Sequence, residues 1–231
     1  MAYTEKPDAM SFLREWTSLA ESGSGERGIF NRQAATKQAA KNGRRDPNYE
    51  WGCNPCSEIL LRGPKIDKNG QPVTGTGGQF CNLSEVIIRA TDTKKDLLRK
   101  VRLATILGTV QSTYTKFPYL RKIWSKNTAE ERLLGVSLTG IMDNELTNGK
   151  KGDLPALLEE LKKCAVDTNK EWADRLGIEV STAISCVKPS GTVSQLTNSS
   201  SGIHARHSPY YIRTVRGDNK DPLTEFMISQ G

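Results

Sequence analysis

The chain has 231 residues, with 36% hydrophobic and 26% charged side chains and a formal net charge of +7 at pH 7. This length and composition are typical of a soluble globular protein with one sizeable core or two small ones. The longest apolar stretches, such as residues 133–142, are far shorter than the roughly 20 residues of a membrane span, and the N-terminus lacks an apolar signal core. We therefore expect a cytoplasmic protein and no membrane association.

The positive charge suggests an affinity for anions, but the lysines and arginines are scattered over different predicted elements. Scattered charges are typical of solvated faces, so we expect no direct nucleic-acid binding. The five cysteines have neither the density nor the even count of a secreted disulfide framework. In a reducing compartment these thiols are either buried or reactive.

The segment before the first cysteine motif is predicted to form short elements. Apolar residues at helical spacing predict a helix over 8–22, and Gly23 with Gly25 marks its end. The next predicted elements are a short strand at 28–32, a short helix at 33–41 and an irregular segment at 43–52.

After that motif, predicted strands alternate with helices. Strands are predicted at 58–62, 84–89, 133–142 and 183–188, and a last helix at 221–230. A long helix begins after the capping residue Thr93 and ends before Pro118. Another helix begins at Asp153 and stops at Gly177. The alternation favours an α/β fold with parallel β/α units.

The motif CNPCSEI places Cys53 and Cys56 three residues apart. The pair could be half of a zinc site, but no second Cys pair exists, and His204 and His207 have only two residues between them. A thioredoxin-like dithiol would open a helix, whereas this motif leads into the predicted strand at 58–62. Two incidental thiols in a loop are the third interpretation, and all three remain open on these residues alone.

A second motif, QFCNLSEV, lies on the far side of a glycine-rich excursion at 63–78. Within the excursion, Asn69-Gly70 predicts a hairpin turn because both residues tolerate positive φ. Cys81 of the second motif again precedes a predicted strand. Because one hairpin-like excursion joins the motifs, Cys56 and Cys81 could approach one site.

The stretch PSGTVS at 189–194 lies between a predicted strand and a short predicted helix. The amides of Gly191, Thr192 and Val193 would point outward at a helix N-terminus beside hydroxyl groups, an arrangement that binds phosphate without a lysine. The same residue types make ordinary turns and caps. Phosphate binding and a plain turn are therefore both compatible with this stretch.

Several ordered motifs now point to one family. They are SGSGERGIFNR (22–32), NPCSEI, FCNLSEV, PSGTVSQL, SSGIH and RHSPYYIR (206–213). Together they resemble the ribonucleotide reductases, which remove the 2′-hydroxyl of ribonucleotides to supply deoxyribonucleotides for DNA replication. The first and last are most similar to the adenosylcobalamin-dependent class II. The resemblance implies that residues 1–231 form part of a ten-stranded β/α barrel, with a central finger loop at about 52–60.

The resemblance also implies roles for individual residues. Cys56 at the finger tip becomes a thiyl radical that abstracts the C3′ hydrogen, Glu58 is the general base for the 3′-hydroxyl, and Asn54 binds the ribose hydroxyls. Cys81 is one of two thiols that reduce the substrate and end as a disulfide. The substrate-binding residues implied are Pro55 and Ser57 of the finger loop, and Pro189, Ser190, Gly191, Thr192, Val193 and Ser194, which hold the phosphates. The expected cofactor is adenosylcobalamin, with an external dithiol reductant such as a thioredoxin-like protein and no metal ligands from this chain.

The sequence departs from the family pattern in its redox cysteines. In the family the first reducing cysteine comes from an earlier barrel strand, and residues 1–21 contain no cysteine. We therefore expect the later part of a catalytic barrel, from a split or interrupted gene, with a partner polypeptide that supplies the missing strands and that thiol. The alternative is a non-catalytic or decayed fragment that only binds nucleotide or a partner polypeptide.

The remaining cysteines and tyrosines are assigned structural roles. Cys164 lies on the apolar face of a predicted helix and Cys186 in an apolar predicted strand, so both are expected in the core. Cys53 has no role that the family supplies. The tandem Tyr210-Tyr211 is likewise expected to be structural.

Overall fold

The computed structural model describes residues 2–23, 28–41, 43, 45–212, 214 and 216–231. Gly25 and the rest of the segment 24–27, within the first family motif, lie outside the described residues, as does Arg213 at the end of the last motif. Within the described ranges, no helix combines the length and apolar content needed to cross a membrane.

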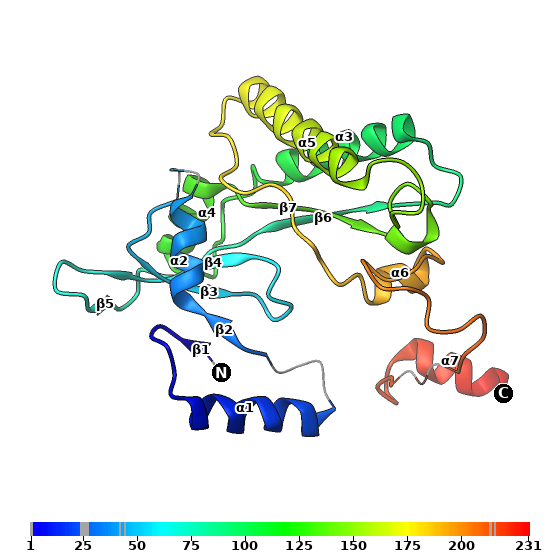
Figure 1. The fold of residues 1–231 in the computed structure, drawn as a ribbon, viewed down its shortest axis with the longest axis horizontal. Coiled ribbons are helices and arrows are strands. Elements are labelled where there is room, and N and C mark those ends of the chain that lie inside the picture. Colours follow the sequence, from blue (N-terminus) through cyan, green and yellow to red (C-terminus); the bar gives the residue numbers. More distant parts are fainter. Residues whose placement is uncertain (1, 24–27, 42, 44, 213, 215) are drawn as a thin grey trace.

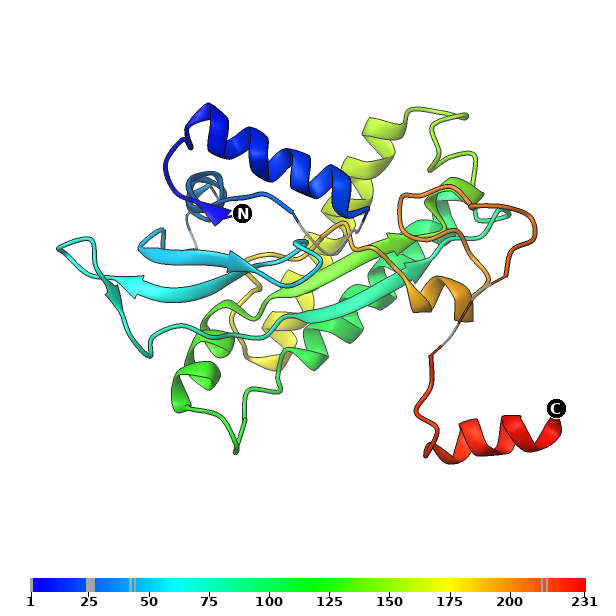
Figure 2. The same cartoon turned by 90° about the horizontal axis from the view of Figure 1, so that it is seen from below.

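The chain forms a mixed α/β structure (Figure 1). Its strands are β1 (Ala2–Tyr3), β2 (Phe30–Asn31), β3 (Tyr49–Cys53), β4 (Leu60–Ile66), β5 (Pro72–Val73), β6 (Asn82–Ile87) and β7 (Leu134–Thr139). Its helices are α1 (Ala9–Ser22), α2 (Arg32–Ala40), α3 (Lys94–Gln111), α4 (Lys122–Glu131), α5 (Leu154–Leu176), α6 (Thr192–Leu196) and α7 (Pro222–Gln230), with a 3-10 turn at Ile141–Asp143. Helix α7 lies apart from the main body in both views (Figures 1 and 2).

The main core lies between a parallel strand pair and two long helices. β6 and β7 pair in parallel, from Asn82 opposite Leu134 to Ile87 opposite Thr139. α3 and α5 cover one face of this pair (Figure 1). The buried residues of this core are Val86, Ile88, Leu97, Val101, Leu134, Val136, Leu157, Leu161, Ala165 and Ile184. The predicted β/α alternation is confirmed here.

Local capping explains where the two long helices begin and end. Thr93 and Asp96 form a reciprocal capping box at the start of α3. The Asp153 side chain accepts a hydrogen bond from the Ala156 amide at the start of α5, and Gly177 ends that helix with a φ of 63°. These predictions from the sequence are confirmed.

The second face of the β6–β7 pair carries the cysteine that precedes β6. Cys81, Leu83 and Glu85 share this face, alternating with Ser84 and Val86, which are buried under the helices. Leu83 is exposed, while Cys81 and Glu85 are half-buried. Parallel sheets are normally covered on both faces, so this face is suited to covering by further structure.

The β3–β4 hairpin lies on that second face (Figure 2). The two strands pair antiparallel, and β4 continues into β5 through the turn around Gly70. Gly135 of β7 allows the close approach, since a Cβ there would lie 2.4 Å from Leu83 Cδ2 and 3.2 Å from Ile59 Cδ1 and Cys186 Sγ. Because Gly135 has no side chain, there is room for the hairpin to pack closely against the sheet.

A buried charged network fixes the base of the hairpin to α4. Arg45 donates from Nε and Nη2 to the two carboxylate oxygens of Glu131, at 2.9 and 2.8 Å. Gln79 Nε2 donates to the same carboxylate at 2.7 Å, and Arg62 lies 3.4 Å from it. The Arg45 guanidinium also stacks over the Trp51 ring at 4.2 Å. The network positions the finger loop that the hairpin carries.

The structure corrects several predicted elements. Residues 49–52 of the segment predicted as irregular, together with Cys53, form strand β3, and the sequence does not predict helix α4. The predicted strand at 183–188 makes a single parallel bridge, between Ser185 and Val136. In the Asn69-Gly70 turn only Gly70 has a positive φ, of 77°. The described strands form three separate small sheets, so the ten-stranded barrel stays an expectation from the resemblance.

Candidate functional site

The finger loop is a tight turn between β3 and β4. The Ser57 amide donates to the Asn54 carbonyl oxygen at 2.9 Å, which places Pro55 and Cys56 at the two central positions of the turn. Proline is favoured at the first of these positions because its φ is already fixed there. Ser57 follows with a φ of 63°, a left-handed conformation that few non-glycine residues adopt. The sequence thus presents Cys56 at the tip.

The two thiols of the CNPC motif have different surroundings. Cys56 is exposed at the tip, whereas Cys53 is half-buried at the end of β3 and its thiol donates to Ser57 Oγ at 3.5 Å. Both are free thiols. In the part of the chain that the structure describes, no group of three or more His, Cys, Asp or Glu side chains is placed to bind a metal ion.

Asn54 uses one half of its side-chain amide to shape the loop. Its Oδ1 accepts from the Ile59 amide at 3.1 Å, and its own backbone amide donates to the Ile59 carbonyl at 3.3 Å. These bonds close the loop around Glu58. The Nδ2 group, which can only donate, is left for a ligand.

Glu58 is a buried carboxylate with no hydrogen bond. Its side chain is only 1% exposed, and neither Oε1 nor Oε2 has a hydrogen-bond partner among the described residues. Lys188 Nζ lies 3.8 Å from Oε1. Buried polar atoms are normally paired, so two free carboxylate oxygens mark a place where a donor is missing.

Two thiols lie near this carboxylate. Burial, reinforced by Cys186 and the negative charge of Glu58, raises the pKa of Cys81 to about 12. Burial and then Glu58 raise the pKa of Cys186 to about 11, an effect that Lys188 opposes. Both groups are therefore neutral thiols at physiological pH, the form that carries a transferable hydrogen.

The position of Cys186 corrects its assignment as a core residue. The preceding residue, Ser185, bridges to Val136 on the helix side, so Cys186 falls on the opposite side with Gly135. Cys164, in contrast, packs against the main core as expected. Cys186 is thus a residue of the candidate site that the apolar character of its segment concealed.

The expected phosphate loop begins directly after Lys188. Its first residues lie against Gly202, where a Cβ would be 3.6 Å from the Ser190 nitrogen. Gly202 in turn lies at the carboxyl end of β7, because its amide donates to Thr139 Oγ1 at 2.9 Å. Ligands bind at the carboxyl ends of parallel strands in open α/β sheets. The buried Ser190 and Ser200 hydroxyls have no hydrogen-bond partner among the described residues.

The amides of this loop are less available than the sequence suggested. The Gly191 amide donates to Ser201 Oγ at 3.2 Å, and the Val193 amide donates to the Ser190 carbonyl at 3.2 Å. Of the three amides, only that of Thr192, an exposed residue, has no hydrogen-bond partner among the described residues. The Ser194 hydroxyl is also occupied, as it donates to the Gly191 carbonyl at 2.6 Å.

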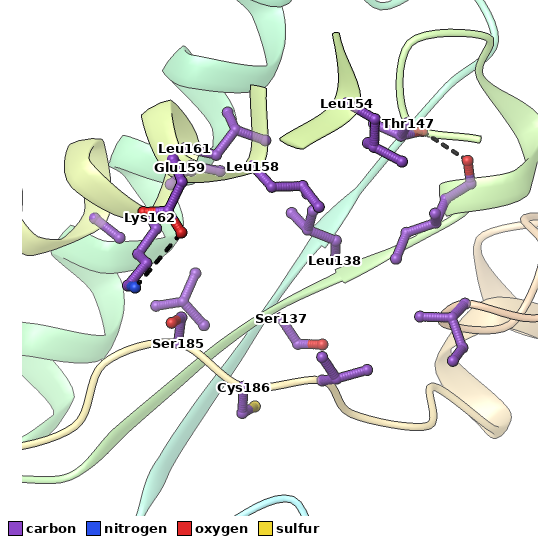
Figure 3. A pocket seen from close by; sticks show the side chains of 16 residues that line it. Ser137, Leu138, Thr147, Leu154, Leu158, Glu159, Leu161, Lys162, Ser185 and Cys186 are labelled. Carbon is purple, nitrogen blue, oxygen red and sulfur yellow. Dashed lines mark hydrogen bonds and ion pairs between the residues drawn. The ribbon is translucent and has the colours of Figure 1, made fainter. Parts of the chain in front are cut away.

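An apolar cavity lies between α5 and the segment at 185–187. Its volume is about 440 Å³, and Leu138 and Leu158 are among the side chains that line it (Figure 3). Cys186 sits at its edge, with its side chain on the side of the segment away from α5 (Figure 3). Cys56, Glu58 and Cys81 do not line this cavity, so the cavity meets the candidate site at Cys186.

The pKa of Cys81 gives a direct test of this arrangement. Because its pKa is raised to about 12, the alkylation rate of Cys81 should keep rising, about tenfold per pH unit, up to and beyond pH 10. Glu58→Gln removes a charge that disfavours the thiolate, so Cys81 should react faster in this variant at each pH. The measurement is iodoacetamide labelling followed by peptide mass spectrometry. A rate that levels off below pH 9 would contradict the buried position.

Comparisons with known proteins agree with the resemblance read from the sequence. The adenosylcobalamin-dependent ribonucleoside-triphosphate reductase of Lacticaseibacillus paracasei is 30% identical over 89% of this chain and 29% of its own length. That of Lactobacillus leichmannii is 29% identical over 74% of this chain and 24% of its own. No protein-family model matches. The chain therefore spans less than a third of these relatives.

A solved structure supports the fold. The crystal structure of a B-12 dependent (class II) ribonucleotide reductase matches 88% of this chain and 29% of its own, with a TM-score of 0.62 and 23% identity. At this level of identity the match concerns the arrangement of the backbone. It agrees with the mixed α/β architecture described above.

Proposed function

Since the chain is a homologue of part of the adenosylcobalamin-dependent ribonucleotide reductases, we propose that it forms the segment of their catalytic barrel that reduces ribonucleotides to deoxyribonucleotides. The proposed active unit is the loop from Asn54 to Glu58 together with Cys81. The loop at 189–194 is proposed to hold the substrate phosphates.

The observation that carries this proposal is the state of Glu58. A carboxylate that is 1% exposed and has no hydrogen bond at either oxygen loses solvation without compensation. A ribose hydroxyl would supply the missing donor. A buried carboxylate that accepts the proton of this hydroxyl is then a general base within hydrogen-bond reach of its substrate.

The other residues of the loop are placed for complementary tasks. Cys56, as a thiyl radical, takes the hydrogen atom from C3′ of the ribose, while Asn54 Nδ2 donates to a ribose hydroxyl. Glu58 accepts the 3′-hydroxyl proton. The 2′-hydroxyl then leaves as water with a proton from one of two thiols, the other thiol delivers its hydrogen to C2′, and the two sulfurs join as a disulfide. Cys56 finally returns a hydrogen atom to C3′.

Cys81 is proposed as one of the two reducing thiols. Its raised pKa, of about 12, keeps it in the S–H form that can donate hydrogen. The second thiol, and the strands that would complete the barrel beside β6 and β7, are proposed to come from barrel segments outside these 231 residues, whether on the same polypeptide or on another. An external dithiol then reduces the disulfide for the next turnover.

Adenosylcobalamin is proposed as the cofactor because the relatives named above depend on it. When bound, it would supply the radical that converts the Cys56 thiol into a thiyl. Pro55 and Cys56, both exposed at the tip, fit this role because a radical generator must reach the sulfur directly. They are the residues of this chain that would face the cofactor.

The proposal is tested by assembling this chain with the remaining barrel segments of a class II relative. Ribonucleoside triphosphates, a dithiol and adenosylcobalamin are supplied, and deoxyribonucleotides are measured by mass spectrometry. We expect product only when this chain and the cofactor are both present. Equal product without adenosylcobalamin would refute the assignment to this class. No product, although the intact relative is active under the same conditions, would refute the proposed function.

A further inference from the structure

Lys188 is the partner of Glu58 that the family motifs do not assign. Its Nζ lies 3.8 Å from Glu58 Oε1, and this is the one ion pair of Glu58 found among the described residues. The Lys188 side chain is 23% exposed, so it reaches from the surface toward the buried carboxylate. The other titratable groups near Glu58 are the neutral thiols of Cys81 and Cys186. Arg45 acts on the first of these thiols and Glu85 on the second.

The backbone of Lys188 is held in place from both sides. Its amide donates to Ser137 Oγ of β7 at 3.0 Å. On the other side, a Cβ on Gly202 would lie 2.9 Å from the Lys188 carbonyl oxygen, and the φ of Gly202 is 53°. A side chain at position 202 would therefore displace the segment. The residue that follows Lys188 begins the proposed phosphate loop.

The separation of the two charges is informative. Charge-assisted hydrogen bonds between nitrogen and carboxylate oxygen are about 2.7–2.9 Å long, so at 3.8 Å the ammonium stabilises the charge without forming a hydrogen bond. Both Glu58 oxygens thus stay free to accept from a substrate hydroxyl. An unpaired carboxylate in the same position would bear the full cost of desolvation, a cost that moving toward solvent would relieve.

We propose that Lys188 is a positioning residue whose charge holds the buried Glu58 carboxylate in the orientation that its role as a base requires. The part that concerns the base rests on the proposed function. The ion pair itself does not depend on it. Cys186 lies near both charges, which act on its thiol in opposite directions.

The ion pair is tested in the isolated chain by a double-mutant cycle with Lys188→Met and Glu58→Gln. Urea unfolding of the wild type, both single variants and the double variant gives four midpoints. We expect Lys188→Met to lower the midpoint when Glu58 is present, and to lower it much less or not at all beside Glu58→Gln. Equal shifts in the two backgrounds would overturn the pairing. Lys163→Met, at an exposed lysine paired with Asp167, is the matched control and should change little.

The functional part is tested in the assembled enzyme with Lys188→Met and Lys188→Arg. Lys188→Met should lower kcat at least about tenfold, whereas Lys188→Arg, which keeps the charge, should restore most of the rate. Rates equal to wild type in Lys188→Met, or no rescue by arginine, would overturn the role. If wild-type chain makes no deoxyribonucleotide while the unfolding cycle still shows coupling, the proposed function fails and the ion pair stands.

Discussion

Deoxyribonucleotide formation should fall at least about 10³-fold when Cys56 is replaced by alanine in the assembled enzyme, because no other group at the loop tip can carry the radical. Cys56 is exposed, and its side chain makes no hydrogen bond within the part of the chain that the structure describes. The substitution should therefore leave the unfolding midpoint unchanged. Product and stability are measured on the same preparation, so that loss of chemistry is separated from loss of fold.

Cys53→Ser is the matched control for this substitution. Cys53 lies three residues before Cys56, and its thiol donates to Ser57 Oγ, a bond that a serine hydroxyl can replace. We expect this variant to retain most of the activity. Full loss in Cys53→Ser together with activity in Cys56→Ala would show that the working thiol had been assigned to the wrong cysteine.

The largest effect on stability is expected at Glu131. Its side chain is 1% exposed and accepts from Arg45 and Gln79. Replacement by alanine leaves the buried guanidinium of Arg45 without its counter-charge, and breaking a buried pair in this way costs about 3–5 kcal/mol. Urea unfolding should show this loss. The finger loop should also lose its fixed position, because the Arg45 Nη2 group that pairs with Glu131 also donates to the Leu60 carbonyl at 2.9 Å.

The neighbouring Glu130 provides the control. It also pairs with an arginine, Arg62, but its side chain is 43% exposed. Exposed ion pairs contribute about 0–1 kcal/mol, so Glu130→Ala should cost far less than Glu131→Ala. Similar losses in the two variants would contradict the view that burial of the network, rather than the number of ion pairs, stabilises the hairpin.

Elements with local signals could be predicted from the sequence. The capping side chains of Asp8, Thr93 and Asp153 act within three residues of themselves, and Gly177 ends α5 through its own φ. Helix α4 lacks such a signal, since Arg121 at its start makes no side-chain capping bond. The sequence therefore does not predict this helix.

Strand β3 shows a different limit. Tyr49 and Trp51 are buried beneath the guanidinium groups of Arg62 and Arg45. Arg45 in turn is held by Glu131, 86 residues further along the chain. No local pattern reports a pairing over this separation, so the sequence predicts an irregular segment where charged and aromatic residues are in fact buried together.

The residues of the candidate site also fall into two groups, those with a local signal in the sequence and those brought in by long-range packing. Asn54, Cys56 and Glu58 lie in one loop, and their motif could be found directly. Lys188 and Cys186 reach Glu58 only because the segment after α5 lies beside β7. The sequence does contain one signal for Cys186. Successive residues of an extended segment point to opposite sides, so when Ser185 lies on the helix side, Cys186 lies on the side of the candidate site.

The central claim is that the Cys56 sulfur takes the hydrogen from C3′ of the ribose. The most direct measurement is a competition, in the assembled enzyme, between ribonucleotide with protium at C3′ and the same compound with deuterium there. Because the C–D bond breaks more slowly, the first deoxyribonucleotide formed should be enriched in the protium form, and the Cys56→Ala enzyme should form none. Product with both labels in equal proportion, together with activity in Cys56→Ala, would contradict the claim.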